Sequence, residues 1–333
     1  MKALVLTSKE DGVVFNPDYP TPQPGYGEVR VRVQAAALNH RDVWITKGMY
    51  AGIKYPTVLG SDGVGVVESV GEGVDAGLVG QTVILNPNVG WGDNPRHQLR
   101  SYSILGLPKD GTLAEYVVVT ADRLRAKPAH LLTEQAAALP LAGMTAYRAL
   151  FGRAGLQPHE KVLINGVGGG VALFAMQFAV AAGAQVYVTS GSEEKIARAV
   201  AMGAKAGANY KEEGWHKAMV KHYGEMDVII DSAGGNGFPA LVDLLAPGGR
   251  IAFYGGGQGN INNLNPQKLF WKQASILGST MASDGEFTAM VDFVEKHGIV
   301  PVVDSVHALE DGKAAFERMA DGAQFGKIVV LTE

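Results

Sequence analysis

Apolar and polar positions alternate along the first third of the chain, and glycine and proline separate the alternating stretches. Val29, Val31 and Val33 follow this pattern, and Val64 and Val66 repeat it. A period of two is typical of β-strands that bury one face, and glycine and proline mark the turns between strands. We therefore predict that residues 1–125 are mostly β-structure.

From about Lys161 the pattern changes to short apolar runs that alternate with helical segments. It predicts strands at Val162–Ile164, Val186–Val188, Val228–Ile230 and Ile251–Phe253, and helices at Val171–Ala182, Glu193–Met202 and Phe238–Leu245. Strands and helices that alternate in this way form a parallel, doubly wound sheet, so the fold class is α/β. The tail from Asp284 holds two helical and two strand patterns and ends with a strand at Lys327–Leu331. The pattern alone does not assign this tail to either domain.

Length and charge divide the chain further. The 333 residues are enough for about two domains. Residues 126–283 carry 13 Lys and Arg against 10 Asp and Glu, whereas the remaining residues carry 16 against 23. A ligand with phosphate groups therefore prefers the middle segment. The net charge of the whole chain is −4, which argues against nucleic acid as a partner.

The chain contains no cysteine, and this excludes several kinds of chemistry. Disulfides, thiolate nucleophiles, iron–sulfur clusters and cysteine-bound zinc all require that residue. No apolar run is long enough to cross a membrane, and the stretch Ala3–Leu6 is too short for the core of a signal peptide. We expect a cytoplasmic protein without a membrane partner.

A glycine-rich segment between a predicted strand and a predicted helix carries the clearest chemical signal. After the strand Val162–Ile164 the chain places Gly166, Gly168, Gly169 and Gly170, followed by Val171. Glycines permit a tight turn and let backbone N–H groups at a helix N-terminus approach a pyrophosphate. No Lys-Ser or Lys-Thr follows, so the turn is not a P-loop. A plain tight turn is the alternative, but the surrounding βαβ pattern favours dinucleotide binding.

The residues after the second predicted strand bear on which dinucleotide binds. Dinucleotide-binding folds usually place an acidic residue here for the adenosine ribose, whereas this chain has Ser190, Gly191 and Ser192, with Lys195 shortly after. Ser190, Ser192 and Lys195 can accept a 2′-phosphate, which favours NADP(H) over NAD(H). The alternative is that Ser192 is an ordinary helix N-cap and Lys195 lies exposed one turn into the helix.

With these residues in place, the chain resembles the medium-chain dehydrogenase/reductase superfamily over essentially its whole length. The segments that carry the resemblance are Pro56–Gly65, Gly111–Tyr116, Gly166–Ala172 and Phe325–Val329. The resemblance implies a GroES-like β-barrel domain at residues 1–125, completed by residues 284–333. It also implies a Rossmann dinucleotide-binding domain at residues 126–283.

The zinc alcohol dehydrogenases of this superfamily hold a catalytic metal with two cysteines and a histidine. The matching positions here are Asn39, Ser61 and Leu141, and none of these is a usual zinc ligand. The resemblance therefore points to the zinc-free, quinone oxidoreductase-like branch, whose members use NADPH. The turn of that branch reads Ala-x-x-Gly-x-x-Gly. This chain ends the corresponding stretch with Ala172, which departs from the pattern but is still small.

The resemblance also implies roles for individual residues. Asn39 and Thr145 are expected beside the nicotinamide and its ribose, Tyr50 near the substrate, and these three carry the catalytic roles. Tyr210 is expected near the 2′-phosphate. The other cofactor-binding positions are Ser232, Ala233, Gly255, Gly256 and Lys327. The segment Ser275–Ser279 resembles an edge strand that pairs across a dimer axis, so we expect a homodimer or homotetramer.

Two clusters allow a second interpretation. Tyr50 and Lys54 have the spacing of the catalytic pair of short-chain dehydrogenases, but in that family the pair follows the glycine turn, so we interpret the match as chance. The cluster of Phe270, Trp271 and Lys272 could contact a substrate, but we expect it to pack at a helix end.

A third cluster could hold a metal ion. His40, Asp42 and Asp62 are all possible ligands, but their spacing is not diagnostic. We predict no metal and interpret His40 as a hydrogen-bonded residue of the cleft.

These observations predict an NADPH-dependent oxidoreductase that transfers hydride to quinones, enones or related carbonyl compounds without zinc. Two alternatives stay open. One is a medium-chain alcohol dehydrogenase-like protein that acts on alcohols or aldehydes. The other is a non-catalytic NADPH-binding protein with the same fold, because a fold does not determine a function.

Overall fold

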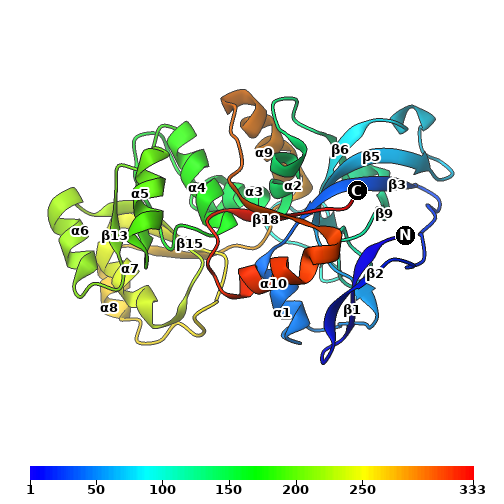
Figure 1. Ribbon diagram of the computed structural model, residues 1–333. Helices are drawn as coiled ribbons and strands as arrows, with labels where there is room; N and C mark the ends of the chain where they lie inside the picture. The colour runs from blue at the N-terminus through cyan, green and yellow to red at the C-terminus, as the bar shows by residue number, and fades with distance from the viewer. The chain divides into compact units, whose positions relative to one another are not determined.

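The computed structural model describes residues 1–333, which divide into two compact units (Figure 1). Unit 1 comprises Met1–Ala142 and Ser283–Glu333, and unit 2 comprises Gly143–Ala282. The tail whose assignment the pattern left open therefore joins unit 1. No helix of either unit is long and apolar enough to span a membrane.

Unit 1 is built mainly from β-strands, as its alternating sequence predicts. One sheet has the strand order β2-β1-β4, and a seven-stranded sheet has the order β10-β6-β5-β3-β18-β17 with β9 paired to β3. The strands are β1 (Ala3–Ser8), β2 (Gly12–Asn16), β3 (Glu28–Ala37), β4 (Thr57–Val58), β5 (Asp62–Val70), β6 (Thr82–Leu85), β9 (Tyr116–Thr120), β10 (Leu124–Ala126), β17 (Val303–Ala308) and β18 (Lys327–Leu331), with a short pair formed by β7 (Asn88–Val89) and β8 (Ser103–Ile104). Val29, Val31 and Val33 are fully buried on β3.

Four helices complete unit 1: α1 (His40–Thr46), α2 (Thr133–Ala138), α9 (Asp284–His297) and α10 (Gly312–Ala320). The predicted domain boundary at residue 125 differs from the structural division, because α2 packs against β3, β5 and β18 and therefore stays with unit 1. The tail forms two helices and two strands, in agreement with its pattern.

Unit 2 contains a six-stranded sheet in which every pair of neighbours is parallel. The strand order is β13-β12-β11-β14-β15-β16. The strands are β11 (Lys161–Ile164), β12 (Gln185–Ser190), β13 (Ala206–Asn209), β14 (Met226–Asp231), β15 (Leu245–Phe253) and β16 (Ser275–Gly278). The order reverses between β11 and β14, which makes a topological switch point of the kind where doubly wound sheets bind ligands.

Helices connect these strands, and all of them except the one that precedes β16 bury apolar residues. They are α4 (Gly170–Ala181), α5 (Glu193–Ala201), α6 (Trp215–Tyr223), α7 (Phe238–Leu244) and α8 (Pro266–Trp271), while α3 (Pro140–Tyr147) crosses the division between the units and continues into a π-helical segment, Arg148–Arg153. The predicted strands lie within the observed ones, and Leu163, Ile229 and Ile251 are fully buried in one apolar cluster. The prediction of an α/β Rossmann unit with a β-rich partner is therefore confirmed.

One glycine of unit 1 occupies a place too tight for any side chain. A Cβ on Gly65 would lie 2.1 Å from the carbonyl oxygen of Arg32 on the paired strand. We expect Gly65→Ala to lower the free energy of unfolding by about 1–3 kcal/mol, because the backbone of β3 would have to move. Urea unfolding measures this. The control is Gly285→Ala, since nothing lies within 4 Å of its Cβ position and alanine favours a helix. Equal losses of stability in the two variants would contradict the prediction.

Candidate functional site

The glycine turn of unit 2 has the geometry that a phosphate site needs. Gly166 and Gly168 have φ angles of +78° and +136°, which residues with a side chain rarely adopt. Gly169 is the N-cap of α4, and Gly170 and Val171 are its first two residues. Backbone N–H groups in the first turn of a helix have no acceptor within the helix, and they favour an anion. The turn can therefore hold a phosphate group.

A hydrogen-bond network fixes this turn to the carboxyl ends of three strands. Asn165 Nδ2 donates to Asp231 Oδ1 at 2.7 Å, and Thr189 Oγ1 donates to Asn165 Oδ1 at 2.6 Å. Thr189 Oγ1 also accepts from the N–H of Gly166 at 3.0 Å. Asp231 is fully buried and accepts from the N–H of Gly234 at 2.9 Å. This network was not predicted from the sequence, although each member stands at or just after the end of a parallel strand.

The residues after β12 lead directly into α5, and the capping alternative for Ser192 is correct. Ser192 caps α5, where its Oγ accepts from the N–H of Lys195 at 3.4 Å. Ser190 is buried, and its Oγ accepts from the N–H of Ser192 at 3.3 Å. Lys195 is half-buried rather than exposed, and its stem runs over the turn, since a Cβ on Gly168 would lie 3.0 Å from Lys195 Cδ.

Two further residues lie over the same segment. A Cβ on Gly191 would lie 2.7 Å from Lys211 Cε and 3.0 Å from the hydroxyl of Tyr210. Tyr210 therefore lies beside the residue that follows β12, and its place near a 2′-phosphate stays a prediction. Lys211 adds a cation that was not predicted. Lys211 was hard to predict because the strand before it, Ala206–Asn209, contains no apolar run that would mark it as a strand.

The other predicted residues of unit 2 occupy two loops and one helix. The loops after β14 and β15 touch, because a Cβ on Gly255 would lie 2.5 Å from the carbonyl oxygen of Ser232, and Gln258 N donates to the carbonyl oxygen of Ala233 at 2.9 Å. Gly256 belongs to the second loop. Thr145 lies on α3, where it is buried and its hydroxyl is 4.0 Å from Met281 Sδ.

In unit 1, Asp62 is the centre of a buried charged cluster. Strand pairing places Asp62 opposite Ala37 on β3, and Ala37 opposite Val329 on β18, so the ends of three strands meet. Lys327 Nζ donates to Asp62 Oδ2 at 2.8 Å and to Asn39 Oδ1 at 2.6 Å. Asn39 Nδ2 donates to Asp62 Oδ2 at 2.9 Å, and the N–H of Leu141 donates to Asp62 Oδ1 at 2.7 Å. Asp62 is 0% exposed and Lys327 3% exposed.

A second buried cation lies beside this cluster. Arg41 Nη1 donates to Ser61 Oγ at 2.6 Å and to the carbonyl oxygen of Leu105 at 3.0 Å. Its guanidinium carbon is 5.6 Å from the centre of the Tyr50 ring, which is a cation–π distance. Tyr50 is half-buried, and its hydroxyl makes no hydrogen bond within the chain. It is therefore free to donate to a ligand.

The remaining candidates near this cluster do not form a metal site. Asp42 is fully buried, its Oδ2 accepts from the N–H of Asn39 at 2.8 Å, and burial raises its pKa. Desolvation, followed by the Lys327 charge, lowers the pKa of His40. The ring of His40 makes no hydrogen bond within the chain, and its centre lies 6.3 Å from that of the Trp44 ring. The structure therefore shows no partner for the interpretation of His40 as hydrogen-bonded.

The residues of unit 1 do not fit a zinc ion. Asn39 is bound to Lys327 and Asp62, Ser61 is bound to Arg41, and Leu141 offers only an apolar side chain. These are the three positions that match zinc ligands, and no group of three His, Asp or Glu side chains elsewhere is arranged to hold a metal. Lys327 and Arg41 thus occupy the side-chain oxygens of Asn39 and Ser61, which a metal ion would need as ligands.

We expect the purified protein to carry far less than one zinc ion per chain, because a stable site needs three or four protein ligands. Elemental analysis after treatment with a chelator measures this. About one retained zinc per chain, with activity proportional to it, would contradict the expectation.

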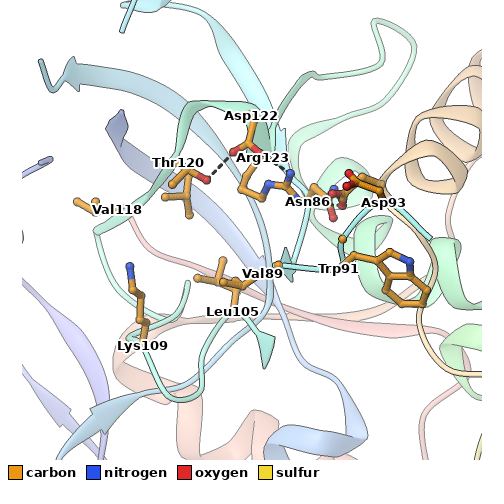
Figure 2. Close-up of a pocket in the computed structure, with 14 residues that line it drawn as sticks. Asn86, Val89, Trp91, Asp93, Leu105, Lys109, Val118, Thr120, Asp122 and Arg123 are labelled. Carbon is orange, nitrogen blue, oxygen red and sulfur yellow. Dashed lines mark hydrogen bonds and ion pairs between the residues drawn. The ribbon is translucent and has the colours of Figure 1, made fainter. Parts of the chain in front are cut away.

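A cavity of about 390 Å³ also opens in unit 1, between the loop at residues 86–110 and strand β9 (Figure 2). Trp91 and Asp93 lie on one side, and Val118 and Lys109 on the other. Two of the charged groups at its wall are paired, since Arg123 Nη1 donates to Asp284 Oδ1 at 2.7 Å. None of the residues predicted to bind cofactor or substrate lines this cavity.

Known proteins share both units. An alcohol dehydrogenase GroES-like domain matches residues 25–129, and a zinc-binding dehydrogenase domain matches residues 170–296. The zinc-type alcohol dehydrogenase-like protein YogA of Leptosphaeria maculans is 35% identical, over 93% of this chain and 92% of that protein. The human quinone oxidoreductase is 30% identical, over 94% and 92% of the two chains.

Two solved structures are similar over nearly the whole chain. An NAD-dependent alcohol dehydrogenase superposes with a TM-score of 0.94 at 38% identity and covers 100% of both chains. The 2-octenoyl-CoA carboxylase reductase CinF, solved with NADP and 2-octenoyl-CoA, has a TM-score of 0.89 at 27% identity, over 99% of this chain and 87% of the other. A GroES-like unit and a Rossmann unit together define a two-domain dehydrogenase or reductase. The chain belongs to the medium-chain dehydrogenase/reductase superfamily of oxidoreductases.

Proposed function

We propose that the protein is an NADPH-dependent reductase of quinones, enones or related carbonyl compounds that works without zinc. The observation that carries the proposal is that Asn39 and Ser61, at two positions that match zinc ligands, are bound to Lys327 and Arg41. The Asn39 amide keeps a hydrogen-bond donor at its position. Zinc stabilises an alkoxide by several kcal/mol as a Lewis acid. A conjugated carbonyl compound needs less stabilisation from the protein, because the negative charge left by hydride addition is delocalised by resonance. Such substrates suit a site built from hydrogen-bond donors.

Unit 2 supplies the residues that would hold the cofactor. The turn at Gly166, Gly168, Gly169, Gly170 and Val171 fits a pyrophosphate, because its backbone leaves the first amides of α4 free. When bound, a reduced nicotinamide supplies the hydride. The loops with Ser232, Ala233, Gly255 and Gly256 stand at the carboxyl ends of β14 and β15, where doubly wound sheets bind the rest of a dinucleotide.

Residues after β12 and β13 favour the phosphorylated form of that cofactor. Ser190, Ser192 and Lys195 stand where β12 ends and α5 begins, the hydroxyl of Tyr210 lies over Gly191 between the two serines, and no acidic side chain follows the strand directly. The 2′-phosphate can be held by the cation and the hydroxyls together. CinF, which binds NADP, supports this assignment, whereas the NAD-dependent alcohol dehydrogenase favours the other cofactor.

Unit 1 supplies groups that act on the substrate. Tyr50 has a free hydroxyl beside the Arg41 guanidinium, and Asn39 has an amide held by Lys327. A hydrogen bond from either group stabilises negative charge on a carbonyl oxygen as hydride arrives.

The test is to follow NADPH consumption with a quinone, an enone and a simple aldehyde, and cofactor reduction with ethanol. We expect kcat/KM for the enone or the quinone to exceed that for ethanol by at least about tenfold. Comparable values would favour alcohol oxidation, which the 38% identical alcohol dehydrogenase makes the second candidate. Tight NADPH binding without turnover of any substrate would indicate a non-catalytic protein.

We further propose that β16 pairs with its copy in a homodimer. β16 is the last strand of its sheet and has one free edge. Phe270 and Trp271, at the end of α8 just before it, are 60% and 84% exposed. The expectation that these two rings pack at the helix end is therefore wrong: they lie on the surface of the single chain, where a second copy can cover them.

A further inference from the structure

Asn39 is held by two partners that together permit only one orientation of its amide group. An ammonium group has only donors, so the amide atom facing Lys327 must be oxygen. A carboxylate has only acceptors, so the amide atom facing Asp62 must be nitrogen. The Lys327–Asp62 pair thus fixes the positions of Oδ1 and Nδ2 of Asn39.

This arrangement leaves one N–H of Asn39 for a ligand. The amide nitrogen carries two hydrogens, and Asp62 is its only acceptor in the structure. The Lys327 ammonium 2.6 Å from Oδ1 also draws electron density toward the oxygen, which strengthens the remaining N–H as a donor. Because the amide cannot flip, this group always donates and never accepts.

We propose that Lys327 and Asp62 are positioning residues that make Asn39 a permanent hydrogen-bond donor to a carbonyl-type oxygen of the reacting molecules. The inference rests on the proposed reductase function and extends it to two buried residues that act through Asn39. Lys327, which the resemblance places among the cofactor-binding positions, would serve that site by holding Asn39. The oxygen belongs either to the substrate carbonyl or to the carboxamide of the nicotinamide, and both sources share the same chemistry.

A purely structural role for the pair is the competing explanation. Lys327 and Asp62 are both buried, so removing one leaves an unpaired charge that is costly by itself. A single variant therefore cannot separate charge balance from amide orientation. The double variant Asp62→Asn/Lys327→Met can, because it removes both charges but gives Asn39 a neighbour that is both donor and acceptor.

The experiment compares the unmutated protein, Lys327→Met, the double variant and the exposed control Lys313→Met. Thermal melting, NADPH affinity by fluorescence, and kcat and KM for an enone are measured for each. We expect Lys327→Met to melt roughly 5–15 °C lower and the double variant to recover most of that loss. We expect kcat of the double variant to remain about tenfold to a hundredfold below that of the unmutated protein and of Lys313→Met.

The cofactor and substrate readouts identify the oxygen. A weaker NADPH affinity in the double variant indicates the nicotinamide carboxamide, whereas an unchanged NADPH affinity with a lower kcat indicates the substrate carbonyl. Recovery of both melting temperature and kcat in the double variant would overturn the positioning role and leave charge balance. If the double variant fails to fold, Asn39→Leu is the second test, because it removes the donor and its hydrogen bonds to both residues but leaves Lys327 paired with Asp62. It must show the same loss of kcat, and full activity in it would overturn the proposal. Failure of the unmutated protein to reduce any quinone or enone would instead overturn the proposed function.

Discussion

Replacing Tyr50 with phenylalanine should lower kcat for enone or quinone reduction about tenfold to a thousandfold, with NADPH affinity nearly unchanged. The hydroxyl of Tyr50 has no partner within the chain, so it is available to the substrate oxygen. The Arg41 guanidinium carbon lies 5.6 Å from the ring centre, and this cation–π contact helps to hold the ring in place. The variant therefore loses a hydrogen bond that stabilises the negative charge developing on the substrate oxygen in the transition state, and this lowers kcat. Steady-state kinetics with an enone and a separate NADPH titration measure the two effects.

Tyr55→Phe is the matched control for this variant. Tyr55 lies in the same loop between α1 and β4, is 42% exposed, and its hydroxyl likewise makes no hydrogen bond within the chain. Loss of a hydroxyl as such should affect both variants equally, whereas a role in stabilising the oxyanion affects Tyr50→Phe alone. If Tyr50→Phe kept the full kcat, the oxyanion would have to be stabilised by another group, and Asn39 would be the first to examine.

The parts of the fold that could be predicted are those whose burial leaves a repeating pattern. The strand Val162–Ile164 is fully buried and therefore entirely apolar, which makes it visible in the sequence. Strand β13 was missed because its residues are small: a Cβ on Gly207 would lie 2.5 Å from Ile196 Cγ2 and 2.8 Å from Val188 Cγ2. The helix α6 that follows it, Trp215–Tyr223, buries only Met219 and carries little apolar signal.

The candidate site also contains one part that could be predicted from the sequence and one part that could not. The glycine turn could be recognised because its residues are adjacent in the chain and glycine has a specific conformational use. The Asp62 cluster could not, because Asp62 and Lys327 are 265 positions apart and only the pairing of β3 with both β5 and β18 brings them together. Lys327 could be named from the family resemblance, but its partners could not. A buried ion pair can be predicted from the sequence only when its two residues lie close together in the chain.

The site residues of unit 2 illustrate how one position can serve two purposes. Ser192 caps α5 through its Oγ, and the same oxygen lies at the end of β12 among the residues proposed to bind a phosphate. A cap can fix the first turn of a helix and thereby the stem of Lys195, whose N–H is the one that Ser192 accepts. The structural and functional interpretations of Ser192 are therefore compatible, and only the ligand preference separates them.

Replacing Lys195 with alanine should weaken NADPH binding about tenfold to a hundredfold and leave NADH binding nearly unchanged. The stem of Lys195 runs along Gly168, so its ammonium group is held near the turn rather than free in solvent. A hydrogen bond to a charged group contributes roughly 1.5–3 kcal/mol, which corresponds to that range of affinity. NADH lacks the 2′-phosphate, so removing the Lys195 ammonium group takes away no contact with it. Titration of both cofactors against the unmutated protein and the variant measures the effect.

Lys217→Ala provides the control, because Lys217 is an exposed lysine of α6 in the same unit and makes no contact with the turn. It removes the same net charge as Lys195→Ala, so a long-range effect of charge on an anionic cofactor would appear in both variants. A local contact with the 2′-phosphate appears in Lys195→Ala only. Equal affinity of the unmutated protein for NADPH and NADH would contradict the assignment, and Ser190, Ser192 and Lys195 would then have a structural role alone. The enzyme would in that case resemble the NAD-dependent alcohol dehydrogenase in its cofactor as well as in its fold.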